Sequence, residues 1–278
     1  MFMEIMLEKY QGCGNDYFIL DPNKQQCELT QKMIQQICNR NFGFGSDGIL
    51  YGPIFEGEKP IVKILNPDGS EAEKSGNGVR IFAKYLKDAG YVQKKSAVVH
   101  TLDGEVEVKY LDESGNRIRA NMGKASFKSS EIPVTGPERE VIDEEMIFGG
   151  KKYYATCVSV GNPHCILQVN ELSKERIEKI GPFIETSSYF PNRINVHLMK
   201  VLDRKNLQIE IYERGAGYTL SSGTSACAVA AAAYRLGLAD TKVNVHMQGG
   251  SMVAEIADSG DIYLTGDVER IGRLIWEY

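Results

Sequence analysis

The stretch that decides the fold is Ser222-Gly223-Thr224-Ser225 together with the run after it, Ala226-Cys227-Ala228-Val229-Ala230-Ala231-Ala232-Ala233-Tyr234. This run is almost uncharged and consists mostly of small residues, so a helix formed by it has little polar surface and belongs inside the protein. The N-terminus of such a helix carries unpaired N–H groups and a partial positive charge into the interior. We therefore expect an anionic group to bind at this helix start.

The first half of the chain contains a second copy of the arrangement. There, Ser75-Gly76-Asn77-Gly78 precedes the apolar run Val79-Arg80-Ile81-Phe82-Ala83. Helical spacing places Val79, Phe82 and Leu86 on one face, and Gly90 is a typical residue at which a helix ends. Two such helix starts predict a duplicated fold with one site between its halves.

Short segments of alternating apolar and polar residues surround both predicted helices, and each is typical of a strand. Further helices are predicted from Thr30, a candidate N-cap, and over 173–180. The predicted fold class is α+β, with two similar lobes, each made of many short antiparallel strands wrapped round a central helix, and an active site in the cleft between them. We expect the N-terminal lobe to comprise 1–128 plus 269–278, and the C-terminal lobe 129–268.

Composition bounds the function. The chain has 278 residues and a formal net charge of −5, which gives no electrostatic reason to expect a nucleic-acid or membrane partner. No run approaches the roughly 18 apolar residues that cross a bilayer, and the N-terminus does not have the pattern of a signal peptide. The six cysteines are scattered without a C-x-x-C pair, so we expect reduced thiols and a cytoplasmic protein.

Several common site chemistries are not supported. The segment 43–48 fits G-x-G-x-x-G, but a predicted helix precedes it and a predicted strand follows it, the reverse of the order in a dinucleotide site. The four histidines, His100, His164, His197 and His246, have no metal-site spacing, so no metal is expected. The chain has no G-x-S-x-G motif of a serine hydrolase.

Asparagine turns recur at the ends of predicted strands, around Asn66, Asn162 and Asn195, and Glu213-Arg214 follows another strand. Each turn by itself is compatible with an ordinary structural role, and Glu213-Arg214 with a structural ion pair. Together, neutral amides with one carboxylate and one guanidinium suit a zwitterionic amino acid. Arg214 would bind its carboxylate in bidentate fashion and Glu213 its ammonium group.

The motifs, taken together, resemble those of the diaminopimelate epimerase family. They are Gly14-Asn15-Asp16, Asn66-Pro67-Asp68-Gly69-Ser70-Glu71-Ala72, Gly76-Asn77-Gly78, Gly161-Asn162-Pro163-His164 and Glu213-Arg214-Gly215, in family order over nearly the whole chain. The resemblance implies the duplicated fold that this family shares with proline racemase and the phenazine-biosynthesis isomerase. It also implies chemistry without pyridoxal phosphate, metal or any other cofactor, on a small amino-acid substrate, in a possible homodimer and in lysine biosynthesis.

In the family, one residue removes the α-proton of an amino acid and a second residue delivers a proton to the opposite face. By position, these catalytic residues are Ser75 and Ser222, with His164 or Glu213 as possible auxiliary partners. The helix N-termini would hold the α-carboxylate. The implied substrate contacts are Asn15, Asn66, Gly76, Asn77, Asn162, Asn195, Glu213, Arg214, Gly223 and Thr224.

The chain departs from the family at the two proton-transfer positions, where the family has cysteine and this chain has Ser75 and Ser222. A hydroxyl is far less acidic than a thiol and needs a neighbour to act as a base. The main interpretation remains an amino-acid epimerase. The alternatives are a related isomerase or lyase that uses a carboxylate or histidine, a catalytically silent amino-acid-binding homologue, and a form in which both cysteines were replaced to trap substrate.

Overall fold

The computed structural model describes residues 4–72 and 75–277. The chain forms two compact units, Met1–Asn121 with Thr265–Tyr278 and Met122–Leu264. The sequence placed the corresponding boundaries at 128/129 and 268/269. Each unit is described by itself.

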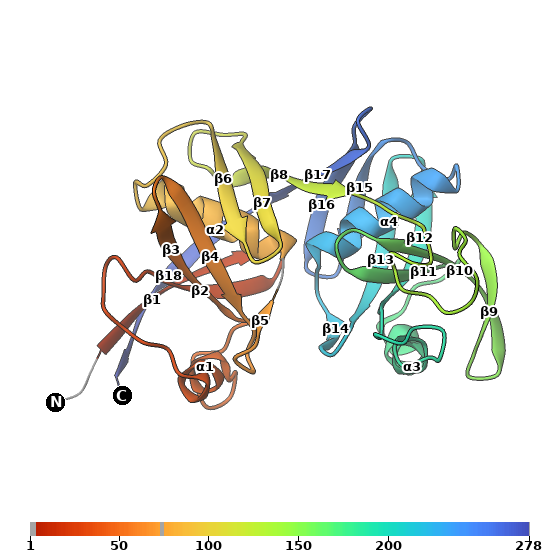
Figure 1. The fold of residues 1–278 in the computed structure, drawn as a ribbon, viewed down its shortest axis with the longest axis horizontal. Coiled ribbons are helices and arrows are strands. Elements are labelled where there is room, and N and C mark those ends of the chain that lie inside the picture. The colour runs from red at the N-terminus through yellow and green to blue at the C-terminus, as the bar shows by residue number, and fades with distance from the viewer. Residues whose placement is uncertain (1–3, 73–74, 278) are drawn as a thin grey trace. The chain divides into compact units, whose positions relative to one another are not determined.

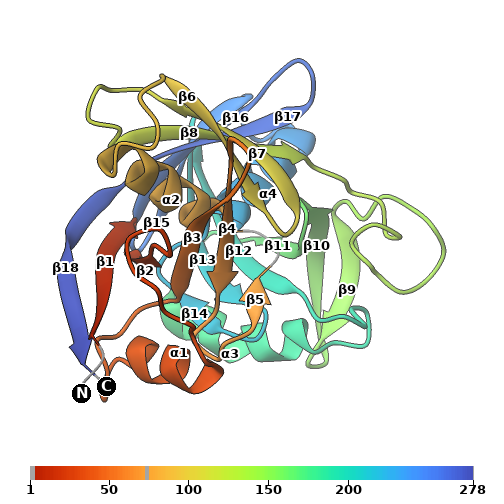
Figure 2. The same cartoon turned by 60° about the vertical axis from the view of Figure 1, so that its left-hand side comes forward.

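In its described residues, the first unit is a mixed sheet with two helices. Its central strands pair in the order β18-β1-β2-β3-β4-β6-β7-β8, and β5 adds to β4. Figure 2 shows β18 alongside β1, so the end of the chain returns to its beginning. The elements are β1 (Glu4–Gly12), β2 (Asn15–Leu20), α1 (Gln31–Cys38), β3 (Ile49–Glu56), β4 (Lys59–Leu65), β5 (Glu71–Ala72), α2 (Gly76–Asp88), β6 (Ser96–Thr101), β7 (Gly104–Tyr110), β8 (Arg117–Lys124) and β18 (Glu269–Glu277).

The second unit is built in the same way. Its strands pair in the order β9-β10-β11-β12-β13-β15-β16, and β14 adds to β13. The elements are β9 (Glu144–Phe148), β10 (Lys151–Ser159), β11 (Pro163–Gln168), α3 (Lys174–Glu185), β12 (Asn195–Asp203), β13 (Asn206–Glu213), β14 (Gly217–Thr219), α4 (Gly223–Arg235), β15 (Lys242–Met247), β16 (Gly250–Ile256) and β17 (Asp261–Asp267).

The two units repeat one topology, strand for strand. In the first, β1–β2 is antiparallel, β2–β3 parallel, β3–β4 antiparallel, β4–β6 parallel and β6–β7 antiparallel. In the second, β10–β11, β11–β12, β12–β13, β13–β15 and β15–β16 follow the same sequence of directions. The helices α1 and α3 occupy equivalent places, as do α2 and α4. This repeat confirms the duplicated α+β fold predicted from the two helix starts.

Both predicted central helices are enclosed by strands (Figure 1). Helix α2 contacts β1, β2, β3, β6 and β7, and α4 contacts β10, β11, β12, β15 and β16. Every residue of α4 from Gly223 to Ala233 is buried, which its small side chains permit because the strands can approach closely. Helix α2 also buries a charged side chain, Arg80, which is completely inaccessible to solvent.

Local signals placed α1 correctly. Thr30 is the N-cap of the helix, and its hydroxyl accepts a hydrogen bond from Met33 N at 3.3 Å. The G-x-G-x-x-G segment 43–48 lies after α1 and before β3, the order predicted from sequence.

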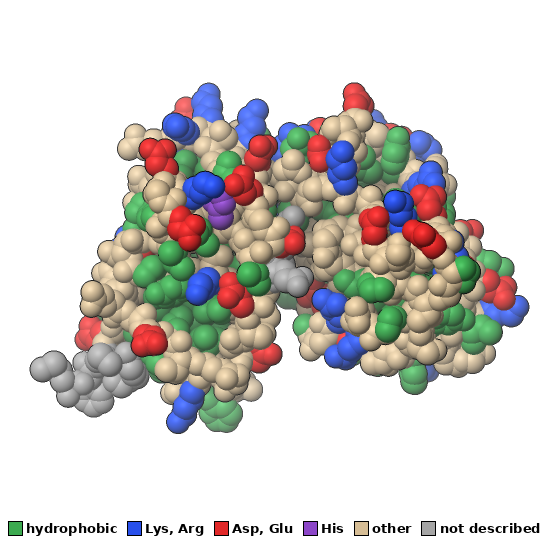
Figure 3. All heavy atoms as spheres, viewed as in Figure 1, with side chains coloured by type: hydrophobic (Ala, Val, Ile, Leu, Met, Phe, Trp, Pro, Cys, Tyr) green, Lys and Arg blue, Asp and Glu red, His purple; other side chains and the backbone are tan. Residues whose placement is uncertain are grey.

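On the face drawn in Figure 3, basic and acidic side chains lie interspersed. None of the helices within the described residues combines the length and hydrophobicity that a bilayer crossing requires.

Candidate active site

Ser75 is the N-cap of α2. Its backbone is extended (φ −138°, ψ 119°), and its Oγ accepts a hydrogen bond from Gly78 N at 3.0 Å. The Tyr17 hydroxyl, from β2, lies 3.4 Å from the same Oγ. The sequence predicted Ser75 as a site residue but gave no reason to single out Tyr17. The structure therefore places two hydrogen-bonding groups on the Ser75 hydroxyl.

The first turn of α2 is stabilised by the buried Arg80. Its Nη1 donates to Gly76 O at 2.9 Å and its Nη2 to Asn77 Oδ1 at 2.6 Å. Asn77, predicted as a substrate contact, is only 2% exposed and its side-chain oxygen binds Arg80. The guanidinium thus places a positive charge beneath the turn whose N–H groups begin the helix, which strengthens this helix start as an anion site.

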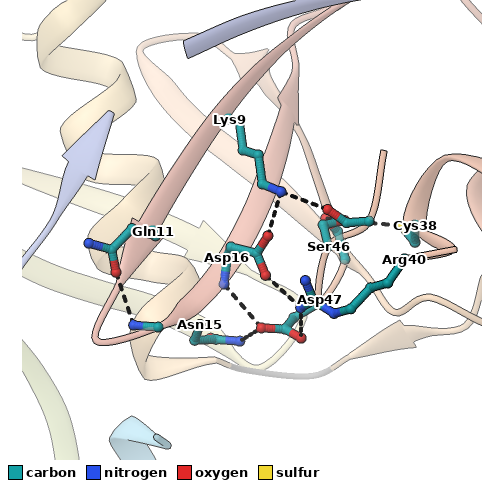
Figure 4. Close-up of polar contacts among 11 residues, drawn as sticks. Lys9, Gln11, Asn15, Asp16, Cys38, Arg40, Ser46 and Asp47 are labelled. Atoms are coloured by element: carbon teal, nitrogen blue, oxygen red, sulfur yellow. Dashed lines mark hydrogen bonds and ion pairs between the residues drawn. The ribbon is translucent and has the colours of Figure 1, made fainter. Parts of the chain in front are cut away.

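Asn15 lies at the start of β2 and belongs to a charged network (Figure 4). Its Nδ2 donates to Asp47 Oδ2 at 2.7 Å, and Asp16 N donates to the same oxygen at 3.0 Å. Arg40 Nη2 lies 2.7 Å from both Asp16 Oδ1 and Asp47 Oδ1. Because Nδ2 faces Asp47, the Asn15 carbonyl oxygen is oriented away from it and can accept a hydrogen bond from an ammonium group.

Asp16 is the buried centre of this network. Burial by itself would raise the pKa of its carboxyl, but hydrogen bonds from Arg40 and Lys9 outweigh that cost and hold the pKa below its ordinary value. Lys9 Nζ lies 2.7 Å from Asp16 Oδ2. The carboxylate therefore stays ionised and fixes the Asn15 turn. The sequence did not identify Lys9, Arg40 or Asp47, because they join it only through the tertiary fold.

Asn66 follows β4 and is held within its own turn. Its Nδ2 donates to Ser70 Oγ at 3.0 Å, and the Ser70 hydroxyl donates to Asp68 Oδ1 at 2.6 Å. These contacts fit the ordinary turn role that the sequence left open for this motif. The Asn66 side chain takes part in this turn through its Nδ2 group.

Ser222 repeats the geometry of Ser75 at the start of α4. Its backbone is extended (φ −148°, ψ 130°), and its Oγ accepts a hydrogen bond from Ser225 N at 3.4 Å. The Thr224 hydroxyl lies 3.3 Å from the same Oγ. Both Ser222 and Thr224 are 6% exposed. Each serine thus caps a buried helix and receives an N–H group from the third residue after it.

A chain of polar side chains reaches Ser222 from the strands of the second unit. His197 Nε2 lies 2.8 Å from His164 Nδ1, and His164 Nε2 lies 2.8 Å from Asn162 Oδ1. Asn162 Nδ2 donates to Thr224 Oγ1 at 3.4 Å. The sequence selected Asn162, His164, Thr224 and Ser222 separately, and the structure links them. His197 was not selected, since its strand gave no sign of which residue it would meet.

Both histidines of this chain are completely buried. Burial lowers the pKa of His164 well below its ordinary value, and the neighbouring His197 and Arg214 lower it further. Burial also lowers the pKa of His197, to about 3. Both rings are therefore neutral at physiological pH, and each carries one proton.

Asn195 connects two segments of the second unit. Its Nδ2 donates to Pro163 O at 2.8 Å, and its Oδ1 accepts from Arg214 N at 2.9 Å. The Arg214 side chain is exposed and donates through Nη1 to Asn192 O at 3.2 Å, while Glu213 at the end of β13 is half-buried. The amide of Asn195 thus sets the position of the Glu213-Arg214 turn beside β11.

A buried carboxylate that the sequence did not identify supports the same turn. Glu185 Oε1 accepts from Gly215 N at 2.7 Å and lies 2.8 Å from Arg193 Nη2. Its side chain is 4% exposed. The sequence-predicted residues are thus divided between the two units, with Asn15, Asn66, Ser75, Gly76 and Asn77 in the first and Asn162, His164, Asn195, Glu213, Arg214, Ser222, Gly223 and Thr224 in the second.

Comparison with known proteins places the chain in a family. The diaminopimelate epimerase family model matches residues 7–128 and 156–271. Diaminopimelate epimerase 2 of Nostoc sp. is 46% identical over 266 residues, which cover 95% of this chain and 93% of that protein. Diaminopimelate epimerase of Synechocystis sp. is 37% identical, with 97% and 98% covered.

Solved structures show the same fold at low sequence identity. A hydroxyproline epimerase from Agrobacterium vitis has a TM-score of 0.69 at 12% identity, covering 99% of this chain and 92% of that one. A phenazine biosynthesis protein of the PhzF family from Bacillus anthracis has a TM-score of 0.67 at 16% identity, covering 99% of both chains. The fold is therefore that of the two-lobed epimerases and isomerases, and the sequence matches establish that this chain belongs to the diaminopimelate epimerase family.

Proposed function

We propose that this protein is a cofactor-independent epimerase that inverts the α-carbon of diaminopimelate, with Ser75 and Ser222 as the two proton-transfer residues. The observation that carries the proposal is the repeat of one capped helix start in both units. In each, a serine Oγ receives a backbone N–H of the first turn, at 3.0 Å from Gly78 and 3.4 Å from Ser225. One serine, as its alkoxide, takes the α-proton and becomes a hydroxyl. The other serine hydroxyl gives its proton to the opposite face and becomes an alkoxide, so the composition of the substrate and the number of protons are unchanged.

The helix starts supply the electrostatics that this reaction needs. Removal of an α-proton leaves negative charge on the α-carbon and its carboxylate. First-turn N–H groups, here that of Gly76 in α2 and those of Gly223 and Thr224 in α4, can donate to that carboxylate because they have no acceptor within the helix. Such prearranged donors stabilise charge that develops in a transition state.

The remaining polar groups suit the rest of a diamino dicarboxylic acid. Asn15, held by Asp47 so that its oxygen faces outward from that pair, can accept from an ammonium group. Arg214 can bind a carboxylate, and Glu213 can accept from an ammonium group. Asn66, Asn162 and Asn195 offer neutral amides.

The test is exchange of the α-proton in deuterated water. LL-diaminopimelate and the meso form are each incubated with the protein, and deuterium at the α-carbon is followed by NMR or mass spectrometry. We expect incorporation together with interconversion of the two forms. Saturable binding of diaminopimelate without any exchange would overturn the proposal. Exchange with other L-amino acids but not with diaminopimelate would overturn the substrate assignment alone.

One observation favours a second candidate. Both proton-transfer positions carry hydroxyls, which ionise far less readily than thiols. A protein that binds the amino acid without inverting it would have the same residues around Ser75 and Ser222. Calorimetric binding combined with an absence of exchange, in both the natural chain and its Ser75→Cys, Ser222→Cys variant, would support this candidate.

We further propose a cytoplasmic location and an amino-acid biosynthetic role. All six cysteines are free thiols, and four of them are buried. Free thiols are characteristic of reducing compartments.

A further inference from the structure

The polar chain that ends at Ser222 contains His197, His164, Asn162, Thr224 and Ser222, and is called here the relay. His197 and His164 are completely buried, and both rings lie within hydrogen-bond distance of a partner. Each neutral imidazole ring has one N–H donor and one acceptor nitrogen. A ring that donates at one end must therefore accept at the other, so all donors of the relay point the same way along it. Two directions are possible, because a half-turn of the Asn162 amide exchanges its oxygen and its NH₂ group, and the two directions present different groups to Ser222.

The far end of the relay distinguishes the two directions. Within the described residues, His197 Nδ1 is a buried ring nitrogen with no hydrogen-bond partner. If donors point away from Ser222, that nitrogen carries a hydrogen and a buried N–H is left unpaired. If donors point toward Ser222, the same nitrogen is a bare acceptor. Orphaned buried N–H groups are rarer in proteins than under-satisfied acceptors. The second direction is therefore favoured.

This direction fixes the proton on each ring and the orientation of the Asn162 amide. His197 Nε2–H donates to His164 Nδ1, and His164 Nε2–H donates to Asn162 Oδ1. Asn162 then turns its NH₂ group toward Thr224 Oγ1, which accepts. Having accepted, the Thr224 hydroxyl can donate to Ser222 Oγ, 3.3 Å away. Ser222 receives this hydrogen bond in addition to that from Ser225 N.

We propose that His197 is a positioning residue that sets the direction of the relay, so that Ser222 Oγ receives a hydrogen bond from Thr224 and keeps its own hydrogen for the substrate. An oxygen that accepts two hydrogen bonds is stabilised when it loses its proton. His197 does not touch the substrate in this role and transfers no proton. The role of Ser222 rests on the proposed function, whereas the direction of the relay does not.

Among the residues of the first unit that the structure describes, Ser75 has a different arrangement. There the position two residues after the turn asparagine is Tyr17, whose hydroxyl lies 3.4 Å from Ser75 Oγ directly. The equivalent residue in the second unit is His164, which is connected to Ser222 only indirectly, through Asn162 and Thr224. Within the described residues the relay leads to Ser222, and changes at His197 should act on that serine.

The experiment begins with the unaltered protein. Nitrogen-15 NMR of labelled histidine reports which ring nitrogen carries the proton. We expect His164 and His197 to be neutral at pH 7 with the hydrogen on Nε2 in both. A hydrogen on Nδ1 of His164, or a charged His164 ring, would overturn the proposal even if the protein shows no epimerase activity.

Two substitutions then separate positioning from packing. His197→Gln can retain a donor near the Nε2 position, and His197→Leu has none. We expect His197→Gln to keep the His164 tautomer and to stay within about twofold of the natural exchange rate. We expect His197→Leu to mix the His164 tautomers and to lower kcat for α-proton exchange about threefold to tenfold, with a smaller change in KM, as fits the loss of one neutral hydrogen bond. The matched control is His246→Leu, which removes a histidine hydrogen-bonded to Ser251 and Asn206 elsewhere in the second unit.

A double-mutant cycle tests transmission through the relay. Thr224→Val breaks the link to Ser222, so adding His197→Leu to it should lower kcat by less than about 1.5-fold further. Full additivity of the two substitutions, or an unchanged His164 tautomer and kcat in a folded His197→Leu protein, would refute the positioning role. If the natural chain shows no exchange, the proposed function fails separately, and the tautomer measurement still decides the direction.

Discussion

The strongest prediction concerns the two serines. Changing both Ser75 and Ser222 to cysteine should raise α-proton exchange steeply, because each residue caps a helix whose first-turn N–H points at the side-chain atom. A thiolate at a helix N-terminus is stabilised by the same groups that now bind Oγ. The cost is a weaker cap, about 1 kcal/mol of stability at each helix.

The size of the gain follows from acidity. A thiol with a pKa of about 8.5 is roughly one-quarter ionised at pH 8, whereas a hydroxyl as weakly acidic as water is ionised to about one part in 10⁸. Once formed, the alkoxide is the stronger base. With a Brønsted slope of about 0.5, its greater basicity offsets about half of the thiol's advantage in ionised fraction, measured on a logarithmic scale. The net expectation is an increase of about 10³-fold in exchange rate.

The assay is deuterium incorporation into diaminopimelate, with the thermal midpoint measured in parallel to confirm folding. Each single variant should accelerate exchange of one configuration more than the other, since each side chain serves one face of the α-carbon. The matched control is Ser225→Cys, which places a thiol at a completely buried position in α4. A folded double variant that binds diaminopimelate but exchanges no faster than the natural chain would refute the assignment of these residues.

Three further predictions concern the surroundings of the serines. Tyr17→Phe removes the hydroxyl that lies 3.4 Å from Ser75 Oγ. We expect this change to lower the rate of α-proton exchange about threefold to tenfold and to leave the thermal midpoint nearly unchanged. Loss of folding rather than of activity would contradict the role of Tyr17 at Ser75. Asp47→Ala removes the acceptor of Asn15 Nδ2 and of Asp16 N and should raise the KM for diaminopimelate more than it lowers kcat. The comparison is Asp112→Ala, which removes the acceptor of Ser114 Oγ and Arg117 N in another turn of the first unit, and equal effects of the two changes on KM would show that Asp47 has no particular importance. Burial lowers the pKa of His197 from 6.5 to about 3, so this ring binds a proton more readily in the unfolded chain than in the folded protein. The stability that neutral His197 contributes is therefore present above about pH 6.5 and is lost as the pH falls from there toward about pH 3. Urea unfolding between pH 7 and pH 4 should show this loss and show less of it in His197→Gln, and an identical pH dependence in both proteins would contradict the burial of a neutral ring.

Much of the fold could be predicted because its signals are local. Thr30 caps α1 through a contact three residues away, and the small-residue run after Ser222 can only be satisfied as a buried helix. The short strands β5 and β14 were not predicted, since two- and three-residue strands exist only through their pairing with β4 and β13. Sequence periodicity does not contain that information.

For the site, the sequence by itself determined which residues begin the two central helices, and with them the family. Ser75 and Ser222 stand before runs whose pattern is readable within a few residues, because capping and helix burial depend on near neighbours along the chain. Only the tertiary structure decided what surrounds them. Tyr17 meets Ser75 across 58 positions of sequence, and His197 meets His164 across 33. Such contacts arise where strand register brings distant side chains together, so the composition of the relay and the direction of its hydrogen bonds are properties of the folded sheet rather than of any segment of the chain.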